Sequence, residues 1–449
     1  MPNALDALRE EAERRYRERT PKSGEWYERA RAAMPGGDTR NSVFFRPYPL
    51  VIEGGAGAYL EDVDGHRYLD CTTNMSSVIL GHAHPAVVEA VTRQVARGTG
   101  WAAANPWAPQ LAELLVERIP SVERVRFTNS GTEAVMMAVR AARAATGRAK
   151  IAKAQGSYHG SHDDFEVRGG HAAAGIIPSA GDHVVEFVYN DPASVTRVME
   201  EHGDDVAAII IDPSFMAGGF LPPAEGFLRH LRDEASRHGG LLIFDEVVSL
   251  RLSLGGAQQL YGVTPDLTAM GKTIGGGFPV GAFGGRAALM DRYSPLEPDF
   301  LHHSGTFNGN PITALAGLTA LRQLDADTVA YVNRLGDRLA HGVARVAAER
   351  GVGLHVTGVG SLRNLQFARS MPRTMADVGA ARRDVGELLR MFLLNEGVLT
   401  ARGGLFALST VTREGEIEGV ADAIGRGLAW LRPALEAEAP ELVAGRAAR

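Results

Sequence analysis

The sequence predicts an α/β protein with a large domain, built on a mainly parallel sheet covered by helices, and a smaller α+β domain made from both chain ends. Three observations support this prediction. Short apolar runs alternate with helical segments through the middle of the chain, a short β-like region precedes them, and long helical segments follow. With 449 residues, 45% of them hydrophobic, the chain can bury a large core and form a second lobe.

Residues 1–84 are assigned to an N-terminal segment and part of the smaller domain. They open with a charged helical stretch, MPNALDALREEAERRYRERT. The segments PYPLVIEGG and GAYLEDVDGHRYLD then carry strand-like apolar residues broken by Gly and Asp turns.

Residues 85–311 are assigned to the large domain. Helical runs such as PAVVEAVTRQVARG alternate here with VERVRF, KIAKA, VAAIIID, LLIFD and LTAMG, which are too short for helices. Such alternation is typical of parallel strands with helices on both faces. Residues 312–449, with helical segments such as VNRLGDRLAHGVARVAAER, complete the smaller domain.

Composition favours a small-molecule partner. The formal net charge is -6 and no long basic run is present, which argues against nucleic acid or an anionic membrane. No apolar signal core or stretch of roughly 20 apolar residues is seen, so a cytoplasmic location is expected. The single cysteine, Cys71, excludes an intrachain disulfide and a thiolate cluster and is interpreted as a buried small hydrophobe; no metal site is expected.

Lys272 is the first candidate for chemistry. The chain has only four lysines, so arginine supplies nearly all of its positive charge. Lys272 lies in LTAMGKTIGGGFPVGAFGG, between apolar and glycine-rich segments. Unlike arginine, a buried lysine can lose its proton and attack an aldehyde, which is the requirement of pyridoxal-5'-phosphate (PLP) catalysis. The alternative is a lysine at a strand end that extends to solvent.

Asp245 ends the apolar run LLIFDEV, where ligands gather in open α/β sheets. A buried carboxylate needs a cation or donors, and the protonated pyridine nitrogen of PLP would serve. A helix cap or a structural ion pair is the competing interpretation. Glu246 beside it is interpreted as a solvent-side or supporting residue.

Further segments offer anion and ring contacts. The segment VRFTNSGTEA is typical of a strand, a turn and a helix. Ser130, Gly131 and Thr132 could therefore bind a phosphate at the helix N-terminus. The alternative is a simple Ser/Thr helix cap with Glu133 in the first turn, which is far commoner than a phosphate site. Tyr158 follows another strand and could stack on a flat ring. In HSGTFNGNP, Ser304, Gly305 and Thr306 form a second possible anion site or an ordinary turn.

Taken together, these motifs resemble the class III (fold type I) PLP aminotransferases, and within them the glutamate-1-semialdehyde aminomutase-like group. The likeness runs from RARAAMPGGDTRNSVFF through GHAHP, NSGTEA, YHG, FDEV, GKTIGGGFPVGAFGG and SGTFNGNP. It implies that Lys272 holds PLP as a Schiff base, that Asp245 pairs with the pyridine nitrogen and that Tyr158 stacks on the ring. It also places these residues in the cofactor site: Ser130, Gly131, Thr132 and His159. Thr306 would reach the phosphate of the neighbouring subunit, which implies a homodimer with shared active sites.

Departures from this group bear on the substrate. Aminomutases of the group have GSWGP before ILGHAHP, whereas this chain has TNMSSV, with Met75 at the tryptophan position. Their APSQFEA-like segment is replaced by TARGGLFAL, which brings in Arg402. TRNSVFF and ARGGLFALS look more like the β-amino-acid aminotransferases, such as β-phenylalanine aminotransferase. By that resemblance Arg40 and Arg402 bind carboxylates, although most of the many arginines must be surface residues.

A last departure is IIIDPSFMAGG, where the family has Glu-Pro followed by small residues or Gln. Asp212 is shorter than that glutamate, and Phe215 and Met216 are bulkier, so the pocket is expected to be narrower or more apolar. The predicted function is transfer of an amino group from an amino acid, most simply a β-amino acid, to a 2-oxo acid such as 2-oxoglutarate or pyruvate. The alternatives are intramolecular transfer, racemisation or decarboxylation, and a non-catalytic PLP-fold protein.

Overall fold

The computed structural model describes residues 3–166 and 174–444 and divides into two compact units. The small unit comprises Met1–Met75, Leu80–His84 and Tyr331–Arg449, and the large unit comprises Ser76–Ile79 and Pro85–Ala330. The boundary near the C-terminal side is therefore Ala330 rather than residue 311. The reason is that helix α12 (Pro311–Arg322) packs against α4 (Pro85–Val95) and α5 (Trp107–Arg118) in the large unit.

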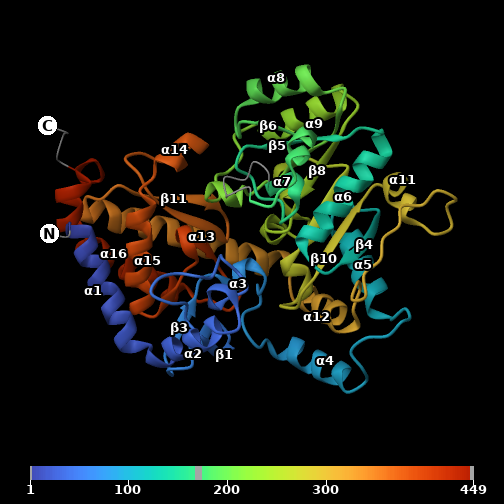
Figure 1. Ribbon diagram of the computed structural model, residues 1–449. Coiled ribbons are helices and arrows are strands. Elements are labelled where there is room, and N and C mark those ends of the chain that lie inside the picture. The colour runs from blue at the N-terminus through green and yellow to red at the C-terminus, as the bar shows by residue number, and fades with distance from the viewer. Residues whose placement is uncertain (1–2, 167–173, 445–449) are drawn as a thin grey trace. The chain divides into compact units, whose positions relative to one another are not determined.

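The large unit is built on a seven-stranded sheet with the order β4-β10-β9-β8-β7-β5-β6 (Figure 1). Its strands are β4 (Arg124–Thr128), β5 (Lys150–Ala154), β6 (Val184–Phe187), β7 (Val206–Ile211), β8 (Leu241–Asp245), β9 (Leu267–Gly271) and β10 (Gly281–Gly285). Only β10 runs opposite to its neighbours in this sheet, pairing antiparallel with both β4 and β9. The prediction of an α/β fold with a mainly parallel sheet is confirmed.

Helices surround this sheet because its strands are apolar on both faces. Every residue of the central β7, VAAIII, is buried. The remaining helices of the large unit are α6 (Gly131–Thr146), α7 (Asp163–Glu166), α8 (Pro192–His202), α9 (Phe227–Arg237), α10 (Gly256–Tyr261) and α11 (Ala287–Met290). Helix α6 packs across β4, β10, β9, β8 and β7, and α9 packs on β7 and β8 (Figure 1).

The small unit joins segments from both ends of the chain. Its first sheet has the order β1-β2-β3-β13, in which β13 pairs with β3 in parallel, with Val398 opposite Leu69. Its second sheet, β11-β12-β14, is antiparallel. The strands are β1 (Ile52–Ala56), β2 (Tyr59–Asp62), β3 (Arg67–Asp70), β11 (Leu354–Val359), β12 (Leu362–Phe367), β13 (Val398–Leu399) and β14 (Leu405–Ala407).

The helices of the small unit are α1 (Ala4–Arg19), α2 (Pro21–Arg31), α14 (Met375–Ala380), α15 (Arg383–Asn395), α16 (Glu414–Glu438), and most of α13 (Ala326–Arg350); the short turn α3 (Thr73–Ser76) ends its N-terminal part. Four of these helices, α1, α13, α15 and α16, contribute to the larger apolar core of the unit. Cys71 is buried in that core, as expected of a small hydrophobe. Among the described residues, no helix is long and apolar enough to cross a membrane, and no cluster of His, Cys, Asp or Glu is suited to a metal ion.

Candidate active site

A pocket opens at the carboxyl edge of the large sheet. Its cavity volume is about 180 Å³. The lining residues follow the ends of β4, β5, β7, β8 and β9 or precede β10: Gly131, Thr132, Tyr158, His159, Gly160, Asp212, Met216, Asp245, Val247, Val248, Lys272 and Val280. Loops that follow parallel strands meet at one edge of the sheet, so five separate segments converge here.

Lys272 directly follows β9 and opens a single turn of 3₁₀ helix, Lys272–Gly275. Its backbone is left-handed, with φ 47°, which is uncommon for a residue with a side chain. Burial lowers the pKa of the Lys272 amine, and the nearby carboxylates of Asp245 and Asp212 oppose this shift. A lowered pKa increases the fraction of neutral amine, which is the nucleophilic form.

Asp245 ends β8, and its buried carboxylate has two partners in the described chain. His159 Nδ1 lies 2.9 Å from Asp245 Oδ2, and the backbone N–H of Val247 donates to Oδ1 at 3.1 Å. His159 is itself buried, and its Nε2 atom has no hydrogen-bond partner among the described residues. From the sequence, His159 could be proposed only because it belongs to the YHG motif. Its contact with Asp245 could not be predicted, because this contact requires β5 and β8 to lie in one sheet.

The N-terminus of α6 borders the same pocket. Ser130 is the N-cap, and its hydroxyl accepts the backbone N–H of Glu133 at 3.2 Å. The capping role considered from the sequence is thus present at Ser130, while Gly131 and Thr132 line the pocket with the helix N-terminus beside them. Gly160 packs so closely that an added Cβ would lie 2.6 Å from Thr132 Oγ1.

Of the three residues Asp212, Phe215 and Met216, only Asp212 and Met216 line the pocket. Asp212 is buried in the pocket wall and accepts hydrogen bonds from Ser214 N at 2.8 Å, Ser214 Oγ at 2.6 Å and Met216 N at 2.9 Å. Burial, and then the charge of Asp245, raise the pKa of Asp212. Met216 lines the pocket, but Phe215 does not: it is fully buried and stacks on Tyr189, with ring centroids 3.9 Å apart.

Tyr158 and Thr306 are both accessible. Tyr158 lines the pocket, and 48% of its surface is exposed. Thr306 lies in the exposed loop that also contains Ser304 and Gly305, outside the pocket lining. This loop is tied to the segment before α6, because Asn129 Nδ2 donates to Asn308 Oδ1 at 2.9 Å.

Arg40 and Arg402 belong to the small unit, whereas the pocket belongs to the large unit. Both side chains are exposed. Arg40 Nη1 donates to Asn74 Oδ1 at 3.0 Å. Arg402 opens a turn in which the backbone N–H of Gly403 donates to Glu387 Oε1 at 2.9 Å.

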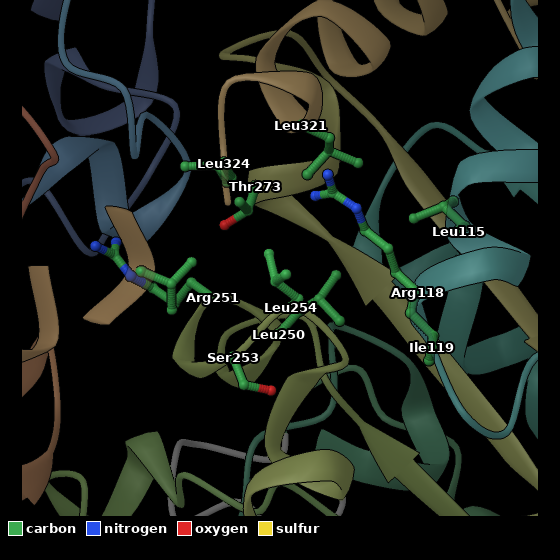
Figure 2. A pocket seen from close by; sticks show the side chains of 11 residues that line it. Leu115, Arg118, Ile119, Leu250, Arg251, Ser253, Leu254, Thr273, Leu321 and Leu324 are labelled. Atoms are coloured by element: carbon green, nitrogen blue, oxygen red, sulfur yellow. The ribbon is translucent and has the colours of Figure 1, made fainter. Parts of the chain in front are cut away.

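A second, much smaller cavity lies elsewhere in the large unit and has a volume of about 20 Å³. Its walls are mostly aliphatic, and the polar residues among them are Arg118, Arg251, Ser253 and Thr273. In Figure 2 the Arg118 side chain extends toward Leu321, and the Arg251 side chain extends away from Leu254. Burial lowers the pKa of Arg251 to about 9. This cavity offers neither a carboxylate nor a lysine, so the pocket at the sheet edge is the candidate active site.

The groups in that pocket match the chemistry of PLP. A phosphate needs backbone N–H donors at a helix N-terminus, which α6 provides at Gly131 and Thr132. A pyridinium nitrogen needs a buried carboxylate, and Asp245 retains capacity for another donor beyond His159 and Val247. The aldehyde needs an amine, which Lys272 carries.

Comparison with known proteins agrees with this chemistry. The family model described as aminotransferase class-III matches residues 42–408. A glutamate-1-semialdehyde 2,1-aminomutase from Rhodopirellula baltica is 42% identical over 77% of this chain and 82% of its own length.

Two solved structures share the architecture. An ω-transaminase from Sphaerobacter thermophilus is 43% identical, with a TM-score of 0.87 over 91% of this chain and 98% of its own. A β-phenylalanine aminotransferase from Variovorax paradoxus is 35% identical, with a TM-score of 0.90 over 96% of this chain and 99% of its own. The chain therefore belongs to the class-III aminotransferases, a family of PLP-dependent enzymes.

Proposed function

We propose that this chain transfers the amino group of a β-amino acid to a 2-oxo acid such as 2-oxoglutarate or pyruvate, with Lys272 as the residue that binds PLP covalently. The observation that carries the proposal is the convergence of Lys272, Asp245 and the α6 N-terminus in one pocket of the large unit. The preference for a β-amino acid rests on TRNSVFF and ARGGLFALS and on the similarity to the β-phenylalanine aminotransferase.

Each pocket residue then has a role toward the cofactor. Gly131 and Thr132 would bind the phosphate, Asp245 would face the pyridine nitrogen, and the ring of Tyr158 would stack on the cofactor. His159 would keep the Asp245 carboxylate in position through its 2.9 Å contact. When bound, PLP withdraws electrons from the substrate carbon that carries the amine.

Lys272 moves the proton that this withdrawal makes acidic. Nζ of Lys272 would take a proton from the amine-bearing carbon of the substrate and would return it on the cofactor side of that amine. The lowered pKa of the amine supports this role, because a protonated ammonium could not accept the proton. Asp212 and Met216, on the wall, limit the space beside the reacting bond.

Arg40 and Arg402 are proposed to bind the carboxylates of donor and acceptor. A guanidinium binds a carboxylate through two parallel hydrogen bonds. Each of the two arginines could therefore bind a carboxylate of the amino acid or of the 2-oxo acid. Thr306 is proposed to contact the cofactor of a second subunit, so that the enzyme is a homodimer. Its exposure in the described chain leaves it accessible for this contact.

A second candidate is glutamate-1-semialdehyde aminomutase, favoured by the 42% identity to a protein of that name. The two functions differ in their need for an acceptor. PLP-loaded protein mixed with racemic β-phenylalanine alone should lose the absorbance of the lysine-bound cofactor and regain it on addition of 2-oxoglutarate. If β-phenylalanine has no effect and glutamate 1-semialdehyde does, the aminomutase assignment replaces ours.

A further inference from the structure

We propose that Asn74 determines specificity for carboxylate substrates by holding the Arg40 guanidinium with a neutral amide, so that the charge of Arg40 stays available. The inference rests on the proposed role of Arg40 in carboxylate binding. It assigns Asn74 as a positioning residue, which acts on the substrate only through Arg40.

The contact that carries the inference is a single hydrogen bond. Arg40 Nη1 donates to Asn74 Oδ1 at 3.0 Å, and both side chains are exposed. Within residues 3–166 and 174–444, this is the only hydrogen bond of the Arg40 side chain, and no carboxylate lies within ion-pair distance of it. Arg338, by contrast, pairs with Glu414 and Glu418 at 2.9 and 2.7 Å. An arginine held by a neutral oxygen keeps its charge and its remaining donors for an incoming anion.

The backbone at Asn74 is held in an unusual conformation. Thr73, Asn74, Met75 and Ser76 have φ values of 45°, 49°, 53° and 73°, which form a left-handed turn without glycine. Residues with side chains rarely adopt this region, and asparagine tolerates it better than most. Such a turn persists only where its surroundings hold it, and it often accompanies a functional site.

Asp70 provides the support for that turn. Its Oδ1 atom accepts hydrogen bonds from Thr72 N at 2.7 Å, Thr72 Oγ1 at 2.8 Å and Thr73 N at 3.1 Å. Its Oδ2 atom lies 2.7 Å from His82 Nε2. The buried Asp70 therefore fixes the start of the turn, and the turn places the Asn74 amide against Arg40 instead of leaving that long side chain free to reorient.

Two substitutions separate the charge of residue 74 from its shape. Asn74→Asp keeps a side chain that tolerates the left-handed region but places a carboxylate on Arg40, where it competes with the substrate. Asn74→Gly places at φ 49° a residue that adopts this conformation readily, and it removes the side-chain amide that contacts Arg40. This variant remains informative if Asn74→Asp fails to fold. Ser42→Asp is the control, because it adds the same charge two residues from Arg40, at an exposed side chain that does not hold the guanidinium in the described chain.

The measurement is calorimetric binding of 3-phenylpropanoate, a carboxylate without an amine, to PLP-loaded protein. Loss of one orienting hydrogen bond in Asn74→Gly should raise Kd roughly 2- to 10-fold. The competing charge in Asn74→Asp should raise it about tenfold or more, and Ser42→Asp should change it less than about twofold.

The possible outcomes distinguish this inference from the function on which it rests. Wild-type affinity in Asn74→Asp, or an equal loss in Ser42→Asp, would overturn the role of Asn74. Arg40→Ala decides the other question: if it leaves 3-phenylpropanoate binding unchanged, the proposed role of Arg40 itself is wrong. If Arg40→Ala weakens binding while neither Asn74 variant does, Arg40 keeps its role and only the inference about Asn74 fails.

Discussion

Replacing Gly160 with alanine tests the anion site at the start of α6. Gly160 has φ +94°, and its added Cβ would lie 2.6 Å from Thr132 Oγ1 and 2.7 Å from Thr132 Cα. We expect backbone strain of about 1–3 kcal/mol together with overpacking of about 1–3 kcal/mol. The clash is relieved by moving Thr132 away from its position in the pocket wall. If about 1–3 kcal/mol of this cost falls on the cofactor-bound state alone, the Kd for PLP rises roughly 5- to 150-fold.

The assay is titration of cofactor-free protein with PLP, followed by the absorbance of the lysine-bound form. Gly147→Ala is the matched control, because Gly147 ends the same helix at φ +71° but has open space around the added Cβ. It should destabilise the fold by about 1–2 kcal/mol, because a residue with a Cβ is strained in this left-handed conformation, and leave PLP affinity unchanged. Wild-type PLP affinity in Gly160→Ala, or an equal loss in Gly147→Ala, would refute the assignment of Thr132 to the phosphate site.

Three further predictions concern the amine, the pocket wall and assembly. Burial lowers the pKa of Lys272, so in cofactor-free protein the folded chain releases this proton at lower pH than the unfolded chain. The free energy of unfolding should therefore rise with pH over that interval, and thermal unfolding of Lys272→Met, which also lacks turnover, should show a smaller rise. Phe215→Ala removes a fully buried ring stacked on Tyr189 and should cost about 3–5 kcal/mol in chemical denaturation. Light scattering should give twice the chain mass for the wild type, and a monomer that binds PLP as tightly as the dimer would contradict the role of Thr306.

The strands that carry the candidate site could be predicted from short-range pattern. VERVRF, KIAKA, VAAIIID, LLIFD and LTAMG correspond to β4, β5, β7, β8 and β9. Each is too short for a helix and is flanked by helical segments, so pattern alone indicates parallel strands. Once these strands share a sheet, Asp245 and Lys272 must meet, because β8 and β9 are parallel neighbours and both residues lie at the same edge.

Other features were missed because they depend on partners distant in the chain. GAFGG was quoted within the glycine-rich stretch after Lys272 and was not assigned to a strand, yet it forms β10. Its Gly281 is required by packing, since an added Cβ would lie 2.0 Å from the carbonyl oxygen of Ser130. Phe215 was expected beside the cofactor but is turned toward Tyr189 by its left-handed backbone, φ 43°.

By itself, then, the sequence determined the fold class, the family resemblance and the residues able to carry the chemistry, because strand length, apolar periodicity and motif order are local properties of the chain. Tertiary structure alone decided which polar groups are neighbours. Two contacts join residues that are far apart in sequence: His159 with Asp245, and Asn74 with Arg40. The burial of Asp212 likewise depends on the folded chain around it. Their energies depend on distance and desolvation, and neither exists until the chain has folded.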